Sequence, residues 1–172
     1  MFYHIIKIQD HLKKKDEVLN HMNSWNRHFV DSNISHATKP DQDTFISNTD
    51  WGGEEFDWYN FSFSQRDKKS IYDFVGNGDA RITKCWFHQY YPHSGSNIGF
   101  HNHSGSDLAF IYYLELEDSS LRTIFINPED YSEVIPDVVE GDLLCFNSNV
   151  WHCALPNDTN TRKSIISFNV NF

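Results

Sequence analysis

The segment from Phe100 to Leu114 reads FHNHSGSDLAFIYYL, and the rest of the chain can be interpreted around it. Two histidines, His101 and His103, stand one residue apart, so both side chains project from the same face of an extended strand. Ser-Gly-Ser-Asp follows as a turn, and the apolar run after it predicts a buried strand. If the first strand lines a barrel, both imidazoles enter its interior, where a third ligand would complete one face of a metal site.

Short runs rich in β-branched and aromatic residues continue on both sides of this segment, separated by turn residues such as Glu140-Gly141-Asp142. Apolar residues at helical spacing predict helices over about 11–30 and 65–75, the second ending at Gly76. Helices followed by about seven strands favour a mainly β fold, a β-sandwich or jelly roll with helices packed on one sheet. The predicted strands are 81–91, 97–103, 108–117, 122–126, 142–146, 150–154 and 164–172, with a short strand at 2–8.

The length of 172 residues suits one domain with a sizeable core. We expect residues 1–80 to form a supporting region of helices and loops, and residues 81–172 to form the β core. Fourteen Phe, eight Tyr and five Trp agree with a β-rich interior, because aromatic residues favour strands. The polar stretch 31–55 is predicted to be a long loop, which either covers an active site or is a surface excursion.

Charge and cysteine content limit the classes of function. Twenty-four acidic and fourteen basic side chains give a net charge of -10, which repels a phosphate backbone and argues against nucleic acid as a partner. Three widely spaced cysteines suggest no disulfide framework. There is no apolar run long enough to cross a membrane and no signal peptide at the N-terminus. We therefore expect a soluble, cytoplasmic protein.

A third histidine and an arginine lie in the last quarter of the chain. His152 follows a Gly-Asp turn and a buried strand, and its neighbours Trp151 and Cys153 give it an apolar setting that favours a neutral imidazole. Ten residues later, Arg162 begins the terminal strand, where a guanidinium can bind a carboxylate through two hydrogen bonds. Taken singly, each has a simpler interpretation: surface or core histidines, and an exposed arginine at a strand end.

The order of these parts resembles the iron(II)- and 2-oxoglutarate-dependent oxygenase superfamily over about residues 81–172. That superfamily carries His-X-Asp/Glu, a distant His and then Arg-X-Ser. The sequence is most similar to its bacterial and phage members that have His-X-His at the first position. The resemblance implies a double-stranded β-helix, iron(II) as cofactor, 2-oxoglutarate as co-substrate, dioxygen, and oxidation of a substrate coupled to decarboxylation to succinate, most simply as a hydroxylase.

The resemblance also implies roles for individual residues. His101, His103 and His152 would hold the metal, and no side chain beyond these ligands is given a catalytic role. The residues implied to bind 2-oxoglutarate are Arg162, Ser164, Gln89 and Tyr91, the last two by similarity to an Asn-X-Tyr pair.

His103 departs from the pattern, since most of the superfamily has a carboxylate there. Asp107 is therefore an alternative third ligand, and the identity of the metal stays open. His-X-His-X-X-X-Asp with a later His also resembles the cupin motif, which predicts a metal enzyme that does not use 2-oxoglutarate. A jelly-roll binding module without catalysis is a third interpretation. The substrate, whether small molecule, peptide or protein side chain, cannot be inferred from the sequence.

Overall fold

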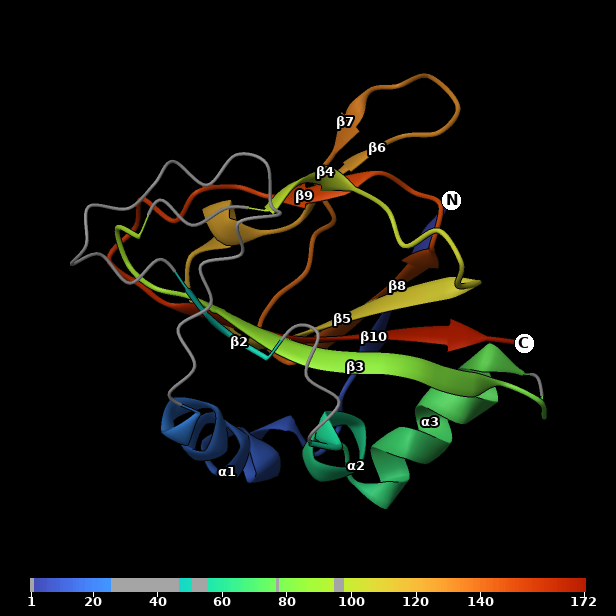
Figure 1. Ribbon diagram of the computed structural model, residues 1–172, viewed down its shortest axis with the longest axis horizontal. Helices are drawn as coiled ribbons and strands as arrows, with labels where there is room; N and C mark the ends of the chain where they lie inside the picture. Colours follow the sequence, from blue (N-terminus) through green and yellow to red (C-terminus); the bar gives the residue numbers. More distant parts are fainter. Residues whose placement is uncertain (1, 26–46, 51–55, 77, 95–97) are drawn as a thin grey trace.

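Two antiparallel β-sheets stacked face to face form the core of the computed structural model, which describes residues 2–25, 47–50, 56–76, 78–94 and 98–172 (Figure 1). In the described residues the larger sheet has the strand order β1-β8-β5-β10-β3-β2, and the smaller sheet has the order β4-β9-β6-β7. The strands are β1 (Tyr3–Lys7), β2 (Ser47–Thr49), β3 (Arg81–Tyr90), β4 (Ile98–His101), β5 (Leu108–Leu116), β6 (Ile124–Ile126), β7 (Glu133–Val134), β8 (Asp142–Asn147), β9 (His152–Ala154) and β10 (Lys163–Asn171). The predicted mainly β fold is confirmed.

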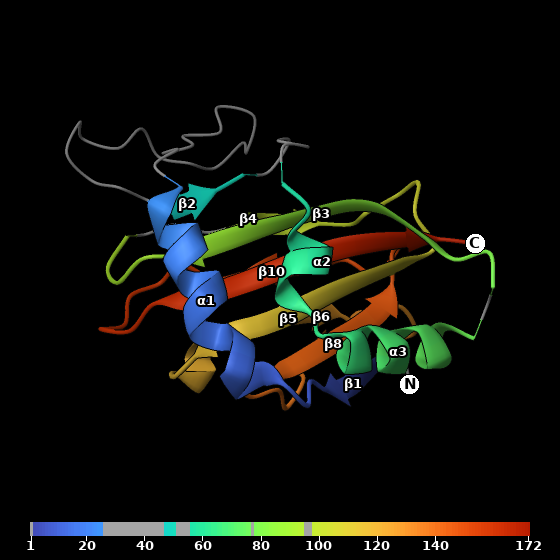
Figure 2. The same cartoon turned by 90° about the horizontal axis from the view of Figure 1, so that it is seen from below.

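The helices cover only one face of the larger sheet, as the view from below shows (Figure 2). They are α1 (His11–Ser24), α2 (Trp58–Ser62) and α3 (Gln65–Val75), and a 3₁₀ turn, η1 (Ser119–Leu121), follows β5. The bounds of α3 agree with the prediction, because the Ser64 side chain caps its first turn and Gly76 ends it with a φ of 67°. Helix α1 ends at Ser24, before the predicted limit. Within the predicted loop 31–55 the structure describes only 47–50, which include β2, and the rest of that stretch lies outside the described residues.

β10 lies in the middle of the larger sheet and holds its two halves together. It pairs with β3 on one side and with β5 on the other, both antiparallel. The pairing with β5 shifts between Ser164 and Ile165, and the pairing with β3 shifts between Asn169 and Val170. Such bulges change which way nearby side chains point, and both bear on the site described below.

Each face of the larger sheet packs into its own apolar layer. Toward the helices, Phe110 and Phe168 stack with ring centroids 4.5 Å apart, above Trp58 of α2 in the same buried cluster. Toward the smaller sheet, Phe125 and Phe146 meet edge to face at 4.8 Å. Aromatic pairs of this kind contribute about 0.5–1.5 kcal/mol beyond the burial of their surface. The side chains of β10 are consequently buried on both faces.

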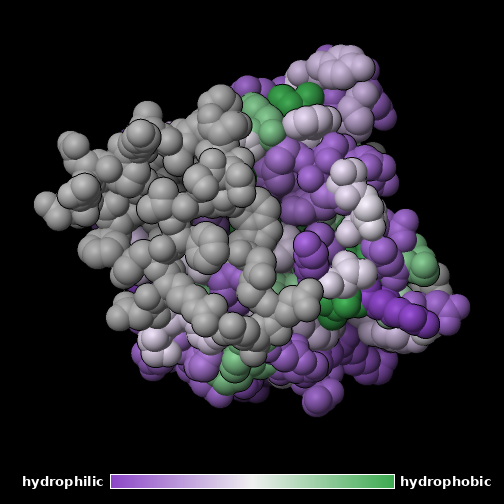
Figure 3. All heavy atoms as spheres, in the orientation of Figure 1, coloured by the Kyte–Doolittle hydropathy of each residue, from purple (hydrophilic) through white to green (hydrophobic). Residues whose placement is uncertain are grey.

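The described surface is mainly hydrophilic on the face seen in Figure 3, where hydrophobic residues form small separate spots. None of the helices in the described part of the chain has the length and apolar character that crossing a membrane requires. All three cysteines are free thiols, as their spacing predicted.

Candidate metal centre and adjoining pocket

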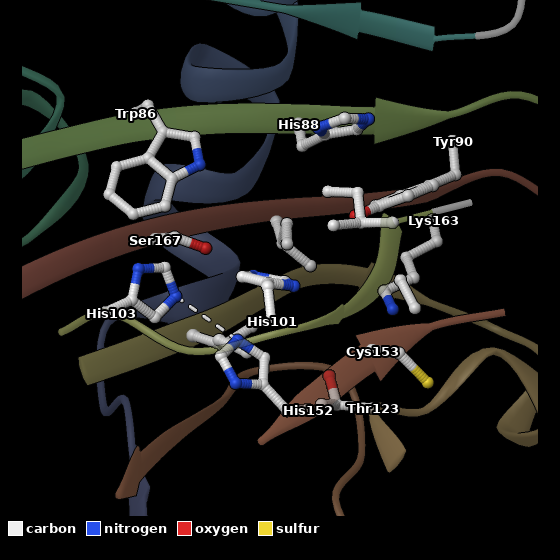
Figure 4. Close-up of a pocket in the computed structure, with 14 residues that line it drawn as sticks. Trp86, His88, Tyr90, His101, His103, Thr123, His152, Cys153, Lys163 and Ser167 are labelled. Atoms are coloured by element: carbon white, nitrogen blue, oxygen red, sulfur yellow. Dashed lines mark hydrogen bonds between the residues drawn. The ribbon is translucent and has the colours of Figure 1, made fainter. Parts of the chain in front are cut away.

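Three histidines converge at the end of the smaller sheet. His101 ends β4 and His152 begins β9, and the two face each other in the antiparallel register of these strands. His103 lies just beyond β4, and the ring nitrogens that the three side chains offer lie within 4.8 Å of one another (Figure 4). The structure thus brings together the three residues that the sequence singled out.

Hydrogen bonds fix the orientation of two of these rings. His101 donates from Nδ1 to the carbonyl of Gly99 at 2.8 Å, and His152 donates from Nδ1 to the carbonyl of Val150 at 3.0 Å. Each ring therefore has an unprotonated Nε2, the arrangement usual for a histidine that binds a metal, and in this structure Nε2 of His152 is hydrogen-bonded to Nε2 of His103.

The spacing of the ring nitrogens suits a shared cation. Nε2 of His103 and Nε2 of His152 lie 3.2 Å apart. Two nitrogens bound at about 2.1 Å to one metal, at right angles, would be about 3.0 Å apart. Three nitrogen donors on one side leave further coordination positions open, which suits a metal that must also bind a substrate. The residues present fit a divalent transition metal.

Burial keeps the three imidazoles neutral. It lowers the pKa of His152 to about 3 and that of His103 to about 4, with a smaller contribution from the neighbouring histidines. Burial also lowers the pKa of His101 from its usual value. Metal binding requires the deprotonated ring, so near neutral pH no proton has to be displaced.

The turn after β4 positions His103 and directs Asp107 elsewhere. The backbone N–H of His103 donates to the carbonyl of Ser148 at 2.8 Å, and the Ser148 hydroxyl donates to the carbonyl of Ser106. The Asp107 carboxylate accepts the backbone N–H of Phe172 at 2.9 Å and is not among the groups that gather at the metal centre. The structure therefore favours His103 over Asp107 as third ligand.

A narrow pocket leads from the histidines along β3 and β10 to Lys163 (Figure 4). Its free volume is about 30 Å³, so any ligand larger than water requires some lining side chains to change rotamer. The lining residues are Trp86, His88, Tyr90, Ile98, His101, His103, Ile111, Thr123, His152, Cys153, Ala154, Lys163, Ile165 and Ser167.

Among the described residues that line this pocket, Lys163 is the one lysine or arginine, and it is 2% exposed. Its Nζ lies 5.0 Å from the ring centroid of Tyr90 and 5.7 Å from that of Tyr113, and among the described residues no carboxylate forms an ion pair with it. Burial lowers the pKa of this lysine to about 7. A buried ammonium without an anionic partner is costly, so this end of the pocket is suited to an anion.

His88 is a second polar group without a partner in the pocket. It is 3% exposed and stacks on Tyr90, with ring centroids 4.2 Å apart. Neither ring nitrogen has a hydrogen-bond partner in the described structure. Burial and the nearby Lys163 lower its pKa to about 3, which leaves a neutral ring with one donor and one acceptor. An unsatisfied buried group of this kind costs about 1–3 kcal/mol, which a polar ligand would recover.

Arg162 and Ser164, predicted to bind the co-substrate, lie on the helix side of the sheet, away from the pocket. Arg162 binds Glu115 through Nε at 2.8 Å and through Nη2 at 3.0 Å, and its Nη1 donates to Asn23 of α1 at 2.8 Å. The Ser164 hydroxyl also donates to Glu115. In this structure the two residues form a hydrogen-bonded ion-pair network with Glu115, and neither lines the pocket.

Gln89 and Tyr91, the other two residues predicted to bind the co-substrate, also lie outside the lining of the pocket. Gln89 donates to the Ser164 hydroxyl at 3.2 Å and accepts from Asn48 at 2.9 Å, both on the helix side, while Tyr91 follows the end of β3 and does not line the pocket. Side chains alternate along a strand, so Tyr90 occupies the place expected for Tyr91. Likewise, the pocket is lined by His88 and not by Gln89, and by Lys163 and not by Arg162.

The fold and the centre together define a jelly roll with a candidate mononuclear metal site at one end of an inward-facing pocket. A scan of known protein families and a comparison with curated proteins both returned no match to the sequence. Solved structures do resemble it, and those described below are at most 20% identical, a level at which the likeness establishes the fold.

Three solved structures show how far the similarity in fold extends. AviO1 from Streptomyces viridochromogenes Tue57 superimposes with a TM-score of 0.69 at 10% identity, covering 99% of this chain and 90% of that one. A prolyl hydroxylase from Trichoplax adhaerens, in complex with a hypoxia inducible factor peptide, superimposes with a TM-score of 0.60 at 20% identity, covering 97% of this chain and 82% of that one. An oxidoreductase of the 2OG-Fe(II) oxygenase family from Burkholderia pseudomallei superimposes with a TM-score of 0.51 at 11% identity. The match covers 63% of this chain and 51% of that one, so this chain spans about half the length of the Burkholderia protein.

Proposed function

We propose that the protein is a non-haem iron(II)- and 2-oxoglutarate-dependent oxygenase. The observation that carries the proposal is the pairing of two sites in one pocket: three neutral imidazoles at one end and, at the other, the buried Lys163, which has no carboxylate partner among the described residues. A dicarboxylate fits between two such positive centres, one a metal ion and the other an ammonium. The similar folds of an enzyme titled a 2OG-Fe(II) oxygenase and of a prolyl hydroxylase support the same chemistry.

His101, His103 and His152 would hold the iron. Three neutral ligands leave the charge of iron(II) uncompensated, so the dianionic co-substrate would supply the negative charge that a carboxylate ligand would otherwise provide. When bound, iron(II) supplies the dioxygen chemistry that protein side chains lack. In the overall reaction one oxygen atom enters the substrate and the other enters succinate, while 2-oxoglutarate loses carbon dioxide.

The chain's own residues bind and orient the co-substrate. Lys163 would donate to the distal carboxylate, moving off the rings of Tyr90 and Tyr113 to do so. The neutral ring of His88 would donate to an oxygen of the same ligand and so gain the partner it lacks. Ile111 and Ile165 line the pocket between the two ends and exclude water from it.

The test measures succinate formation from 2-oxoglutarate under air with iron(II), together with the melting temperature under argon. At a hundred times its Kd, 2-oxoglutarate should stabilise the metal-loaded protein by about 2.7 kcal/mol, or about 5–10 °C for a chain of this size. The variant His152→Ala should lose both effects. Metal uptake with no response to 2-oxoglutarate would refute the proposal and favour a cupin-like enzyme, and absence of metal uptake would favour a binding module.

A further inference from the structure

A second hollow opens on the other side of the histidine centre from Lys163. It has a volume of about 360 Å³ and shares two walls, Trp86 and His103, with the pocket described above. In Figure 4 these two side chains lie at the opposite end of the pocket from Lys163. A molecule in this hollow, which we call the polar hollow, would therefore lie against the metal centre without competing for the lysine end.

The polar hollow is lined mainly by groups that form hydrogen bonds. Ser104 and Ser106 come from the turn that carries His103, and Thr83 and Lys84 come from β3. The register of β3 against β10 skips Thr83, since Asn169 pairs with Lys84 and Val170 with Ile82. This bulge turns Thr83 into the hollow beside Lys84.

Two asparagines of β10 have side-chain carbonyl oxygens that accept no hydrogen bond from a described residue. Asn169 lines the hollow and is only 7% exposed, yet its Oδ1 accepts no hydrogen bond from any described residue. Asn171 donates to the carbonyl of Gly105 at 3.2 Å, and its buried Oδ1 likewise has no partner in the described structure. Asn171 is outside the lining and reaches it only through this bond to Gly105. Rotating the last torsion of Asn169 by half a turn would present its Oδ1 to the hollow, which suits a ligand that donates hydrogen bonds.

The spacing of the asparagines indicates what kind of donor. They are two residues apart on one face of β10, and therefore about 6.8 Å apart. An extended peptide repeats its N–H groups on one side with the same two-residue period. Lys84 is exposed and lies across from Asn169 in register, and of the described residues in the lining it is the one with a formal charge. The hollow thus favours acidic or uncharged peptide side chains over basic ones.

We propose that the polar hollow binds the substrate, and that this substrate is an extended peptide segment with acidic or uncharged side chains. The inference rests on the proposed function, because it takes the histidine centre as the place of oxidation. It adds Asn169 as a residue that selects for the peptide backbone, with Asn171 beside the hollow on the same strand face, and Lys84 as a residue that selects for charge.

The test uses an array of random octapeptides, incubated with the labelled full chain as purified. We expect the retained peptides to be rich in Asp, Glu and uncharged polar residues and poor in Lys and Arg. The strongest of them, made as a soluble blocked peptide, should bind at least about tenfold more weakly to Asn169→Ala, the loss expected for one buried hydrogen bond. Asn149→Ala, a change at an exposed asparagine outside the hollow, should bind as the parent does.

Stability separates a binding role from a structural one. Removing an acceptor that has no partner should leave the melting temperature of Asn169→Ala unchanged or higher. A clear fall in melting temperature, no retained peptide, or equal binding by Asn169→Ala would each overturn the proposal. Peptide retention requires neither iron nor 2-oxoglutarate, so a protein that retains peptides through Asn169 but forms no succinate would refute only the proposed function.

Discussion

Two adjacent residues, Arg162 just before β10 and Lys163 at its start, provide a matched pair of substitutions. Lys163 points into the pocket and Arg162 points to the helix side, where it binds Glu115. We predict that Lys163→Met weakens the binding of 2-oxoglutarate to the zinc-loaded protein, measured by calorimetry. A hydrogen bond to a charged group contributes about 1.5–3 kcal/mol, which corresponds to an increase in Kd of about 10- to 150-fold. Methionine has a similar length, so the packing between Tyr90 and Tyr113 should persist.

Arg162→Met is the control for charge and position. It removes a partner of Glu115 and should lower the free energy of unfolding, while 2-oxoglutarate binds with nearly the parental Kd. Lys163→Met, by contrast, removes a buried ammonium that has no anionic partner in the described structure and should unfold no more easily than the parent. A large loss of affinity in the Arg162 variant with parental affinity in the Lys163 variant would refute the assignment of the pocket.

Three further outcomes are expected. Burial lowers the pKa of Lys163 to about 7, so its side chain is a charged ammonium below pH 7 and loses the charge above it. The Kd of 2-oxoglutarate, measured by calorimetry, should therefore be constant below pH 7 and rise by up to about tenfold per pH unit above pH 7. The pKa values of His103 and His152 are lowered to about 4 and 3, so on dialysis protons should displace zinc only as the pH falls toward 4. Loss of zinc near pH 6.5, about the ordinary pKa of histidine, would contradict the burial of the centre. Asp107→Asn should leave the zinc affinity from competition titration within about twofold, because the Asp107 carboxylate binds the Phe172 backbone; a hundredfold loss would make Asp107 a ligand.

The strands and the histidine centre were accessible from the sequence because their signals are local. Turn residues separate the β runs, and a His-X-His pair places two rings on one face whatever the rest of the fold does. Gly76 ends α3 as its freedom to adopt a positive φ predicts. Helix α2 was missed, since five residues do not establish a helical period.

The residues that line the pocket differ by one position from those predicted to bind the co-substrate, for a physical reason. Sequence periodicity reveals which face of a strand is inward only when the other face meets water, and β10 is buried on both faces. Arg162 and Lys163 are equally polar, so their order along the chain does not tell which enters the pocket. The bulge at Ser164 and Ile165 shifts the register against β5 and is invisible in the sequence. Lys163 differs from the other described lysines and arginines in being buried, with no carboxylate paired to it in the described structure, and burial is a property of the coordinates.

The central place of β10 has a consequence for how the molecule folds. Its two neighbours in the larger sheet, β3 and β5, lie far before it in the sequence and do not pair with each other. Until β10 docks, each presents an open edge of unpaired backbone groups, which favours association between chains. Such long-range pairing slows folding to milliseconds or longer. Docking of β10 also buries Lys163 and the paired residues behind it in one step, so the pocket and the helix layer should form together, late in folding.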